Sequence, residues 1–496
     1  MALKNGISGA IMISIFIFAG INNYGMEGDE VFSYISATSM GGFKGICYLD
    51  DQTWYDADYF KNALTATDEE CFNLKMVVEN QAMDVHPPLY YIFLNFVASI
   101  FAGRFSTWFG IGLNIFFMII MAIGLYLLLQ YFLNNRYMSL FLCTLFCCSG
   151  LSIEMVLFIR MYVLLMALTV FQSWYHLKLY RQILVEKGAS GSKKEYFRDY
   201  LILMILTLLG ALTHYYFLIY QCLIAAFFVI GLWIHKKYPD SFRYIGTMAV
   251  SGIIYLCLYP AMLEHVFFKY RGREAVHKFL KEGTLFGDVI SMFSSFNEKL
   301  FKGWLLPLLA VFIIITVVLL VRGRVEKAKL WRGFCFILPS LIYFFGISKA
   351  SPIVSIRYVS PVAPLIYTTV AVWGQYLLTH ADISTSSLKR SYILSGLFLL
   401  FLVFCFQKEP VKELYFTERK SVVDELAKET DYCIYITGDE YNWKMWEDYV
   451  NYPQFQGLFF IDGRKKQVIS DEKVMKQEAF AVYIDKTLSL EEIYKY

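Results

Sequence analysis

Long apolar runs dominate this chain and decide what it can fold into. Stretches such as residues 106–133 and 303–321 contain no charged side chain. A run of about 20 apolar residues is long enough to cross the hydrocarbon core of a membrane as a helix. Hydrophobic residues make up 57% of the chain, above the roughly 45–50% of soluble proteins. The sequence therefore predicts an all-α polytopic membrane protein that is surrounded by membrane lipid.

Lysines and arginines gather in a few short polar connections between these runs, although the net charge is only +3. So small a net charge gives no general attraction to nucleic acid, and no nucleic-acid partner is expected. Because Lys and Arg resist translocation, loops that are rich in them stay in the cytoplasm. The four loops of this kind are residues 181–198, 235–243, 322–332 and 387–391.

Alternation between the two sides of the membrane then follows from these loops. Residues 199–235 connect two of them and must cross twice, with the polar break at Thr213-His214 facing outside. The same alternation predicts single crossings at residues 244–261, 303–321, 333–347, 356–377 and 392–407. It places three segments outside, namely residues 262–302, residues 348–355 and the tail from residue 408.

The N-terminal third contains one apolar run too many for this alternation. The first run lacks a small-residue cleavage site, so it is expected to remain as a helix with Lys4 inside and residues 24–85 outside. The run at residues 89–102 is short and follows two prolines, and its length is typical of an interfacial helix. If it lies at the membrane surface, the chain has about 11 spanning helices, a cytoplasmic N-terminus and an outer C-terminus.

The tail differs in composition from the rest of the chain. It is charged, and it contains the strand-like runs 432–437, 457–462 and 479–484 with a helix-like stretch at 421–429. These features predict a small extracytoplasmic α/β module. The expected division is therefore a transmembrane domain over residues 1–407, with 24–104 as its first outer loop, and a module over residues 408–496.

Several ionisable residues fall at the predicted outer face. Two adjacent carboxylates, Asp29 and Glu30, directly follow the first helix, and neighbouring anions raise the pKa of one another. Ionisable groups at apolar helix ends are costly and suggest function. The simpler alternatives are carboxylates solvated at a helix end, histidines that only complete packing, and arginines that reach lipid headgroups. The other candidates at this face are His86, Arg104, Arg160, His214, Arg357 and Tyr358.

An acidic centre surrounded by cations suits the transfer of a sugar from a lipid phosphate. Arginine offers a fork of donors to phosphate oxygens. A phosphate leaves as an anion, so it needs electrostatic stabilisation more than protonation. A carboxylate can accept the proton of the attacking hydroxyl, and a single displacement of this kind inverts the anomeric centre.

Six motifs, in this order, resemble those of the GT-C-type membrane glycosyltransferases, in particular the protein-mannosyltransferase and lipid A aminoarabinose-transferase-like group. The resemblance covers residues 5–375 and implies the GT-C fold for the transmembrane domain. It also implies a site at the outer face of a plasma membrane. The motifs are "GDEVFSY", "HPPLYY", "AGRFSTW", "IRMYVLL", "LTHYYFL" and "RYVSPVAP".

This resemblance also implies roles for the candidate residues. The donor would be a monosaccharide linked to a polyprenyl phosphate, and the acceptor, whether glycan, lipid or protein, remains open. Asp29 would be the catalytic base and Glu30 would support it, while Arg104 and Arg357 would hold the donor phosphate. Substrate-binding roles fall to His86, Arg160, His214 and Tyr358.

The need for a divalent metal remains open. The side chains of Asp29, Glu30, His86 and His214 could serve as ligands. Their spacing does not demand a metal, so no cofactor is assigned.

Two other functions remain open from the sequence. A transporter or flippase of lipid-linked sugars would place charges near the midplane of the membrane and would show inverted repeats. A polymerase or ligase of lipid-linked glycans would use the same outer face. The polar residues gather at one face of the membrane and no repeat is evident, which favours the transferase over the transporter.

Overall fold

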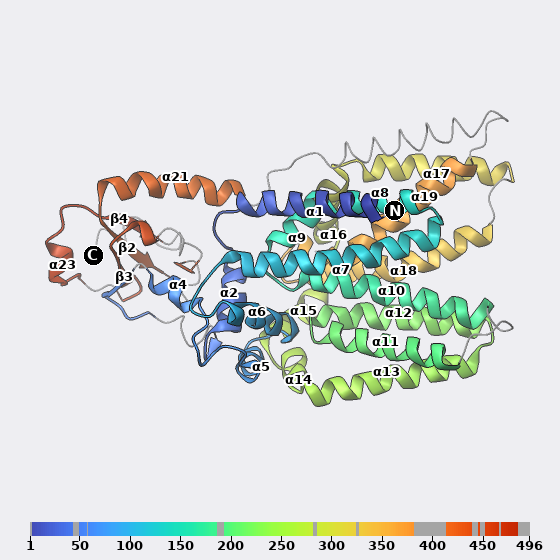
Figure 1. Ribbon diagram of the computed structural model, residues 1–496, viewed down its shortest axis with the longest axis horizontal. Helices are drawn as coiled ribbons and strands as arrows, with labels where there is room; N and C mark the ends of the chain where they lie inside the picture. The colour runs from blue at the N-terminus through green and yellow to red at the C-terminus, as the bar shows by residue number, and fades with distance from the viewer. Residues whose placement is uncertain are drawn as a thin grey trace.

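A computed structural model describes residues 2–42, 49–56, 58–185, 193–280, 285–323, 327–380, 413–438, 445–446, 452–465 and 468–484. Long helices pack side by side, shorter helices cover one end of this bundle, and a small sheet lies beyond them (Figure 1). The predicted loop 387–391 and the predicted crossing 392–407 lie outside the described residues, as does the predicted domain boundary at residue 407.

Three of the described helices are long and apolar enough to cross a membrane, namely α7 (Thr107–Leu133), α12 (Tyr215–Ile234) and α13 (Tyr238–Leu258). Two bent pairs bring the number to five if each pair is one span. The pairs are α8 with α9 (Arg136–Cys147 and Gly150–Leu157, bent by 56°) and α16 with α17 (Leu285–Phe301 and Leu305–Val321, bent by 84°). The described residues thus support a polytopic membrane protein, and the finer figure of about 11 spans stays a prediction.

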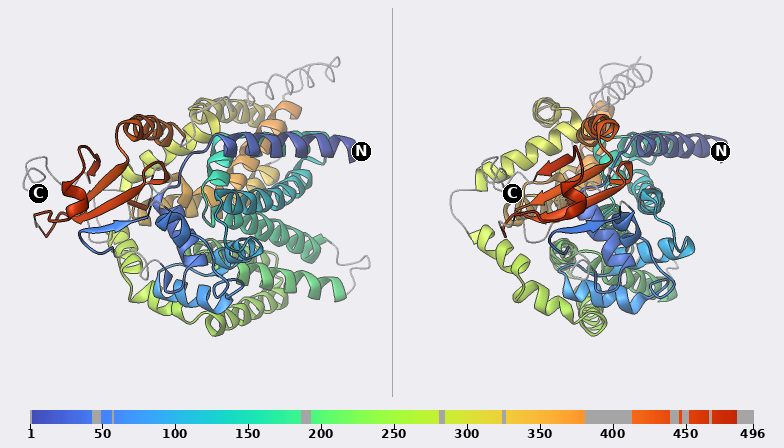
Figure 2. Two further views of the ribbon diagram at one scale, coloured as in Figure 1. Left: turned by 60° about the vertical axis from the view of Figure 1, so that its left-hand side comes forward. Right: turned by 90° about the vertical axis from the view of Figure 1, so that its left-hand side faces the viewer.

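The remaining helices complete the bundle. The N-terminus and the α12–α13 turn lie at the end of the bundle far from the sheet (Figures 1 and 2). The N-terminus and the α12–α13 turn, which the loop charges predict to be cytoplasmic, thus lie at the end of the bundle opposite the sheet, which is predicted to be outside. These remaining helices are α1 (Ala2–Ile21), α10 (Tyr162–Val185), α11 (Lys193–Ala211), α18 (Lys327–Ala350) and α19 (Ala363–His380).

The shorter helices near the sheet come from the predicted outer loops. Helix α6, which covers the predicted juxtamembrane run, is apolar but only 12 residues long. Its Asn95 is fully buried and donates to the backbone oxygens of Ala37 and Glu70, at 2.8 and 3.0 Å. These bonds tie α6 to the first outer loop. The group comprises α2 (Gly28–Thr38), α4 (Tyr59–Ala63), α5 (Leu74–Met83), α6 (Leu89–Ile100), α14 (Ala261–Phe267) and α15 (Tyr270–Leu280).

The tail supplies three strands of a four-stranded mixed sheet with the order β1-β3-β2-β4. Strands β2 and β3 have the predicted bounds, and the third predicted run forms β4. The edge strand β1 comes from the first outer loop and runs antiparallel to β3, with Trp54 opposite Phe459. Helices α21 (Glu413–Glu429) and α23 (Glu472–Met475) accompany the sheet, whose strands are β1 (Thr53–Tyr55), β2 (Tyr432–Thr437), β3 (Gly457–Asp462) and β4 (Ala481–Ile484).

The first outer loop and the tail therefore share one core. Phe60 of α4 is fully buried and packs edge-on against Trp446 of the tail, with ring centroids 4.8 Å apart. The indole N–H of Trp54 donates to Asp471 at 3.1 Å. Aromatic pairs of this kind contribute about 0.5–1.5 kcal/mol beyond their buried area. The tail thus fixes the loop that carries the predicted site.

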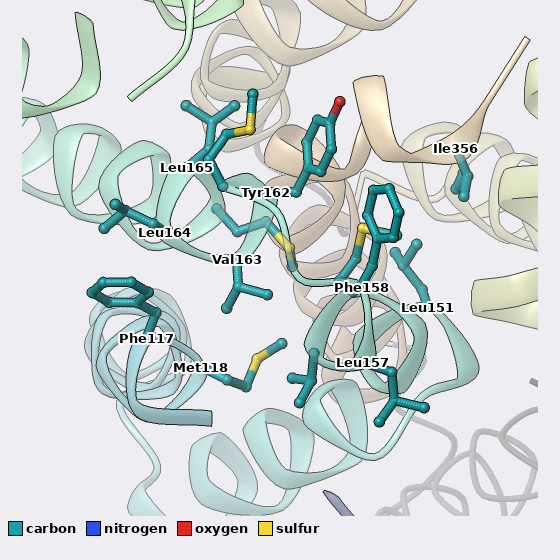
Figure 3. Packing of buried hydrophobic residues seen from close by; sticks show 14 of the residues in the cluster. Phe117, Met118, Leu151, Leu157, Phe158, Tyr162, Val163, Leu164, Leu165 and Ile356 are labelled. Atoms are coloured by element: carbon teal, nitrogen blue, oxygen red, sulfur yellow. The ribbon is translucent and has the colours of Figure 1, made fainter. Parts of the chain in front are cut away.

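The centre of the bundle is packed around α7, α9 and α10. Phe117 and Met118 of α7 face Val163 and Leu164 of α10, with Leu157 of α9 close by (Figure 3). All five side chains are buried and belong to one continuous core. Because interiors of this kind are close-packed, the connection between α9 and α10 has a fixed position, and that connection carries Arg160.

Candidate active site

Helix α2 begins at Gly28 because Glu27, the residue before it, forms a capping box with Glu30. The backbone N–H of Glu27 donates to Oε2 of Glu30 at 2.6 Å, which is the reach-back half of a capping box. Oε1 of Glu30 accepts from the backbone N–H of Ile159 at 3.0 Å. Glu30 is fully buried. Its carboxylate therefore links the start of α2 to the α9–α10 connection and belongs to the framework beside Asp29.

Asp29 lies in the first turn of α2 and pairs with Arg357 of the 3-10 turn η1 (Ile356–Tyr358). Nη1 of Arg357 lies 2.6 Å from Oδ2 of Asp29, whose side chain is 32% exposed. Within the described part of the chain, Oδ1 of Asp29 accepts no hydrogen bond. Burial acts to raise the pKa of Asp29, but the charges of Arg160 and Arg357 outweigh it and hold this pKa below its usual range. Asp29 is therefore ionised and has one oxygen open to a ligand.

Arg160 brings a second cation to Asp29 from the α9–α10 connection. Its side chain is 4% exposed. Nη1 donates to the backbone oxygen of Asp29 at 3.3 Å and to Oγ of Ser33 at 3.4 Å, and Nη2 lies 3.2 Å from Nε2 of His86. A buried guanidinium needs such partners because its desolvation is costly. Arg160 is thus held from three sides.

Each of the two arginines keeps a donor without an acceptor. The Nε atoms of Arg160 and Arg357 are buried and have no hydrogen-bond partner among the described residues. Most buried polar groups in proteins are hydrogen-bonded, so an orphaned donor calls for an explanation. Two orphaned cationic donors on either side of Asp29 suit an anionic ligand, because a guanidinium binds phosphate oxygens through several N–H groups.

His86 lies between Arg160 and a further carboxylate. Nδ1 of His86 lies 2.7 Å from Oδ2 of Asp84, while the backbone oxygen of His86 accepts from the hydroxyl of Tyr259 at 3.1 Å. The two prolines that follow His86 lead into α6. The imidazole is thus fixed at both ring nitrogens and at its own backbone.

His214 caps the N-terminus of α12. Its Nδ1 accepts from the backbone N–H of Tyr216 at 3.0 Å, so the neutral ring carries its proton on Nε2. Burial lowers the pKa of His214 well below its usual range, and the cations Arg160 and Arg357 act in the same direction. The ring of His214 lies 6.4 Å from that of His86. His214 therefore faces the site as a neutral donor.

Aromatic side chains at the ends of four elements surround these polar groups. The ring of Tyr358 lies 6.1 Å from Tyr162 and 5.7 Å from Tyr216. The guanidinium of Arg357 lies over the rings of Phe158 and Tyr358, at 5.3 and 5.2 Å. Cation–π contacts of this kind stabilise a partly desolvated arginine. They hold Arg357 where its Nη1 meets Asp29.

Arg104 does not join this cluster. It lies in the turn between α6 and α7, is exposed, and its side chain makes no ion pair or hydrogen bond within the described part of the chain. The structure thus brings together Asp29, Glu30, His86, Arg160, His214, Arg357 and Tyr358 out of the predicted set.

The structure adds several residues to the cluster that the sequence pattern did not single out. Asp84 stands two positions before His86, and this short spacing could have singled it out. Ser33 follows Asp29 by one helical turn, so its hydroxyl lies on the same face of α2. Tyr162 and Phe158 carried no signal, because aromatic residues are frequent throughout the chain.

A metal site is not evident in this arrangement. No group of three or more His, Cys, Asp or Glu side chains in the described residues is placed to hold a metal ion. The four residues considered as ligands are instead engaged by arginines and by backbone N–H groups.

Neither a protein-family model nor a curated protein matches the chain. Solved structures do match it. One is ArnT from Cupriavidus metallidurans bound to undecaprenyl phosphate, at 10% identity and a TM-score of 0.49, over 92% of this chain and 85% of that chain. The same protein in the apo state matches at 10% identity and a TM-score of 0.45, over 93% and 86% of the two chains.

A second protein also matches. It is the archaeal oligosaccharyltransferase AglB from Archaeoglobus fulgidus, in complex with an inhibitory peptide and a dolichol-phosphate. It matches at 10% identity and a TM-score of 0.41, over 89% of this chain and 63% of that chain. Both matched proteins are polytopic glycosyltransferases of the GT-C type, the class whose motifs the sequence resembles.

Proposed function

We propose that this protein transfers a sugar, with inversion, from a polyprenyl-phosphate-linked monosaccharide to an acceptor at the outer face of the membrane. The observation that carries the proposal is the position of Asp29 between two buried arginines. Arg357 pairs with its carboxylate, Arg160 holds its backbone, and each arginine has an orphaned Nε–H. This arrangement combines an ionised carboxylate with donors for an anion.

The donor phosphate would bind to Arg160 and Arg357. Each guanidinium has donors left over after its contacts with the protein, and charge-assisted bonds to phosphate are about twice as strong as neutral ones. The phosphate gains negative charge as the bond to the anomeric carbon breaks. Cations fixed beside it stabilise that charge without having to reorganise.

The acceptor hydroxyl would be oriented by Asp29. Its Oδ1 is open and its carboxylate is ionised, so it can accept a hydrogen bond from the hydroxyl. As the hydroxyl oxygen attacks the anomeric carbon on the side opposite the phosphate, its proton passes to this carboxylate. One displacement with one base inverts the anomeric centre.

The position of the cluster suits a lipid-borne donor. His214 directly precedes α12, one of the helices that are long and apolar enough to cross a membrane. A polyprenyl chain could therefore remain in the bilayer while its phosphate reaches the arginines. A water-soluble nucleotide sugar would not need a binding site beside a membrane helix.

The test is to reconstitute the purified protein in nanodiscs and supply a panel of polyprenyl-phospho-sugars together with glycan, lipid and protein acceptors. Release of polyprenyl phosphate with any donor supports the proposal, and Asp29→Asn should abolish it in a protein that remains folded. Movement of the intact lipid-linked sugar across vesicles, with no release, would identify a flippase instead. Extension of a lipid-linked glycan chain would identify a polymerase.

A further inference from the structure

The side chains beside Asp29 form one continuous chain of hydrogen bonds that starts at Asp84. Oδ2 of Asp84 lies 2.7 Å from Nδ1 of His86. Nε2 of His86 lies 3.2 Å from Nη2 of Arg160. Nη1 of Arg160 lies 3.3 Å from the backbone oxygen of Asp29. Asp84 is thus connected, through the side chains of His86 and Arg160, to the backbone of Asp29, the predicted catalytic residue.

The direction of each hydrogen bond follows from what the groups can do. A guanidinium only donates, so Nε2 of His86 must be the acceptor in its contact with Arg160. The proton of the neutral imidazole is then on Nδ1, where it is donated to Asp84. This is the arrangement by which a carboxylate fixes the tautomer of a histidine. A doubly protonated ring would instead point an N–H at a cation.

The backbone of the same segment is anchored from outside the first loop. The ammonium group of Lys269 donates to the backbone oxygen of Asp84 at 2.6 Å and to that of Met83 at 2.8 Å. The hydroxyl of Tyr259 donates to the backbone oxygen of His86 at 3.1 Å. Both ends of the Asp84–His86 pair are therefore fixed independently of any ligand.

We infer that Asp84 is a positioning residue for the donor site. It holds His86 as the neutral tautomer whose Nε2 accepts from Arg160, and this bond keeps the guanidinium turned toward the place of the donor phosphate. His86 then acts as a hydrogen-bond acceptor, and it transfers no proton during the reaction. The inference rests on the proposed function for the identity of the ligand, which is a lipid-borne phosphate.

The tautomer can be measured without any ligand. Solid-state NMR of the [15N]histidine-labelled protein in proteoliposomes near neutral pH, with His86 assigned from the spectrum that His86→Gln lacks, should show a protonated Nδ1 and an unprotonated Nε2. In Asp84→Ala the proton should shift wholly or partly to Nε2. A wild-type ring protonated on Nε2, or a spectrum unchanged in Asp84→Ala, would overturn the inference.

Transfer kinetics then separate positioning from proton transfer. Glutamine can donate to Asp84 and accept from Arg160 through its amide, but it cannot exchange a proton. His86→Gln should therefore keep kcat/KM within a few-fold of wild type. His86→Leu and Asp84→Ala should lower it by about 10- to 100-fold, the effect of losing a hydrogen bond to a charged group.

The matched control is Asp68→Ala, an exposed carboxylate in the same outer loop, which should leave kcat/KM unchanged. Loss of transfer in His86→Gln with the NMR tautomer intact would show that His86 exchanges a proton and would overturn the positioning role. If the wild-type protein turned over no lipid-phosphate donor, the proposed function would fail, and the NMR measurement would still decide the tautomer and the role of Asp84.

Discussion

Nη1 of Arg357 lies 2.6 Å from Oδ2 of Asp29, although more than 300 positions separate the two residues in the sequence. The pair joins the first turn of α2 to the 3-10 turn before α19. It leaves one oxygen of the carboxylate and one N–H of the guanidinium without a partner in the described residues. The pair is therefore fixed in position and still able to bind ligands on both sides.

Asp29→Asn should lower donor turnover by about 100- to 10,000-fold, which is the usual contribution of a positioned general base. The amide can still hydrogen-bond, but it cannot accept the hydroxyl proton. Turnover would be followed as released polyprenyl phosphate. Glu69→Gln, at an exposed position in the same loop, serves as the control and should behave as wild type. Normal turnover in Asp29→Asn would remove Asp29 from the chemistry.

Arg357→Gln should shift the acid limb of the pH–rate profile to higher pH. Burial acts to raise the pKa of Asp29, and Arg357 is one of the charges that hold it down. When this charge is lost, Asp29 is protonated at a higher pH, and transfer falls off earlier on acidification. The measurement is kcat/KM against pH for wild type and variant. A limb that does not move would show that Arg357 and Asp29 are not coupled.

The free energy of unfolding should fall as the pH drops below about 6.5. The titration of His214 should account for part of this fall. Its folded-state pKa lies well below the reference value of 6.5, so the unfolded chain binds a proton that the folded protein does not. The contribution is complete above pH 6.5 and shrinks on acidification. His214→Asn keeps an N-cap acceptor and removes the titration. The melting temperatures of the two proteins in nanodiscs should therefore lie close together at neutral pH and separate on acidification, where wild type loses stability faster than His214→Asn.

Glu30→Gln should lower the melting temperature more than any transfer parameter measured at low temperature. Both carboxylate oxygens of Glu30 accept from backbone N–H groups, and an amide can replace only one of them. Loss of a hydrogen bond to a charged group costs about 1.5–3 kcal/mol. Differential scanning fluorimetry would measure the loss. If Glu30→Gln kept its melting temperature but lost turnover, Glu30 would have a direct part in the reaction.

Gly110→Ala should disturb the packing of α7 against the α9–α10 connection, which carries Arg160. A Cβ at Gly110 of α7 would lie 2.1 Å from Cγ2 of Ile159, so the α9–α10 connection must move. Overpacking of this kind costs about 1–3 kcal/mol. Both thermal stability and donor turnover should fall. The double variant Gly110→Ala with Ile159→Ala should recover part of the turnover, because it removes the clash, whereas Ile159→Ala alone should not improve it.

The sequence by itself predicted a polytopic membrane protein and singled out most of the residues that the structure brings into the cluster. Apolar runs require a membrane or an apolar core. Inside a membrane they form helices, because each backbone polar group must then be paired within its own helix. The loop charges predicted that the eight candidate residues share one face, and seven of them lie together in the structure. The strands of the tail could also be predicted from the sequence, because alternating and β-branched residues within a few positions of one another indicate a strand.

Only the tertiary structure decided which neighbours each polar group of the cluster contacts. Adjacent positions on a helix point about 100° apart, so Asp29 and Glu30 face different neighbours, but the sequence does not say which neighbours these are. Glu30 meets the backbone of Ile159, and Asp29 meets Arg357. Arg104 stays exposed in the turn before α7. The strand Thr53–Tyr55 joins the tail sheet through pairing between distant segments, which short-range patterns do not encode.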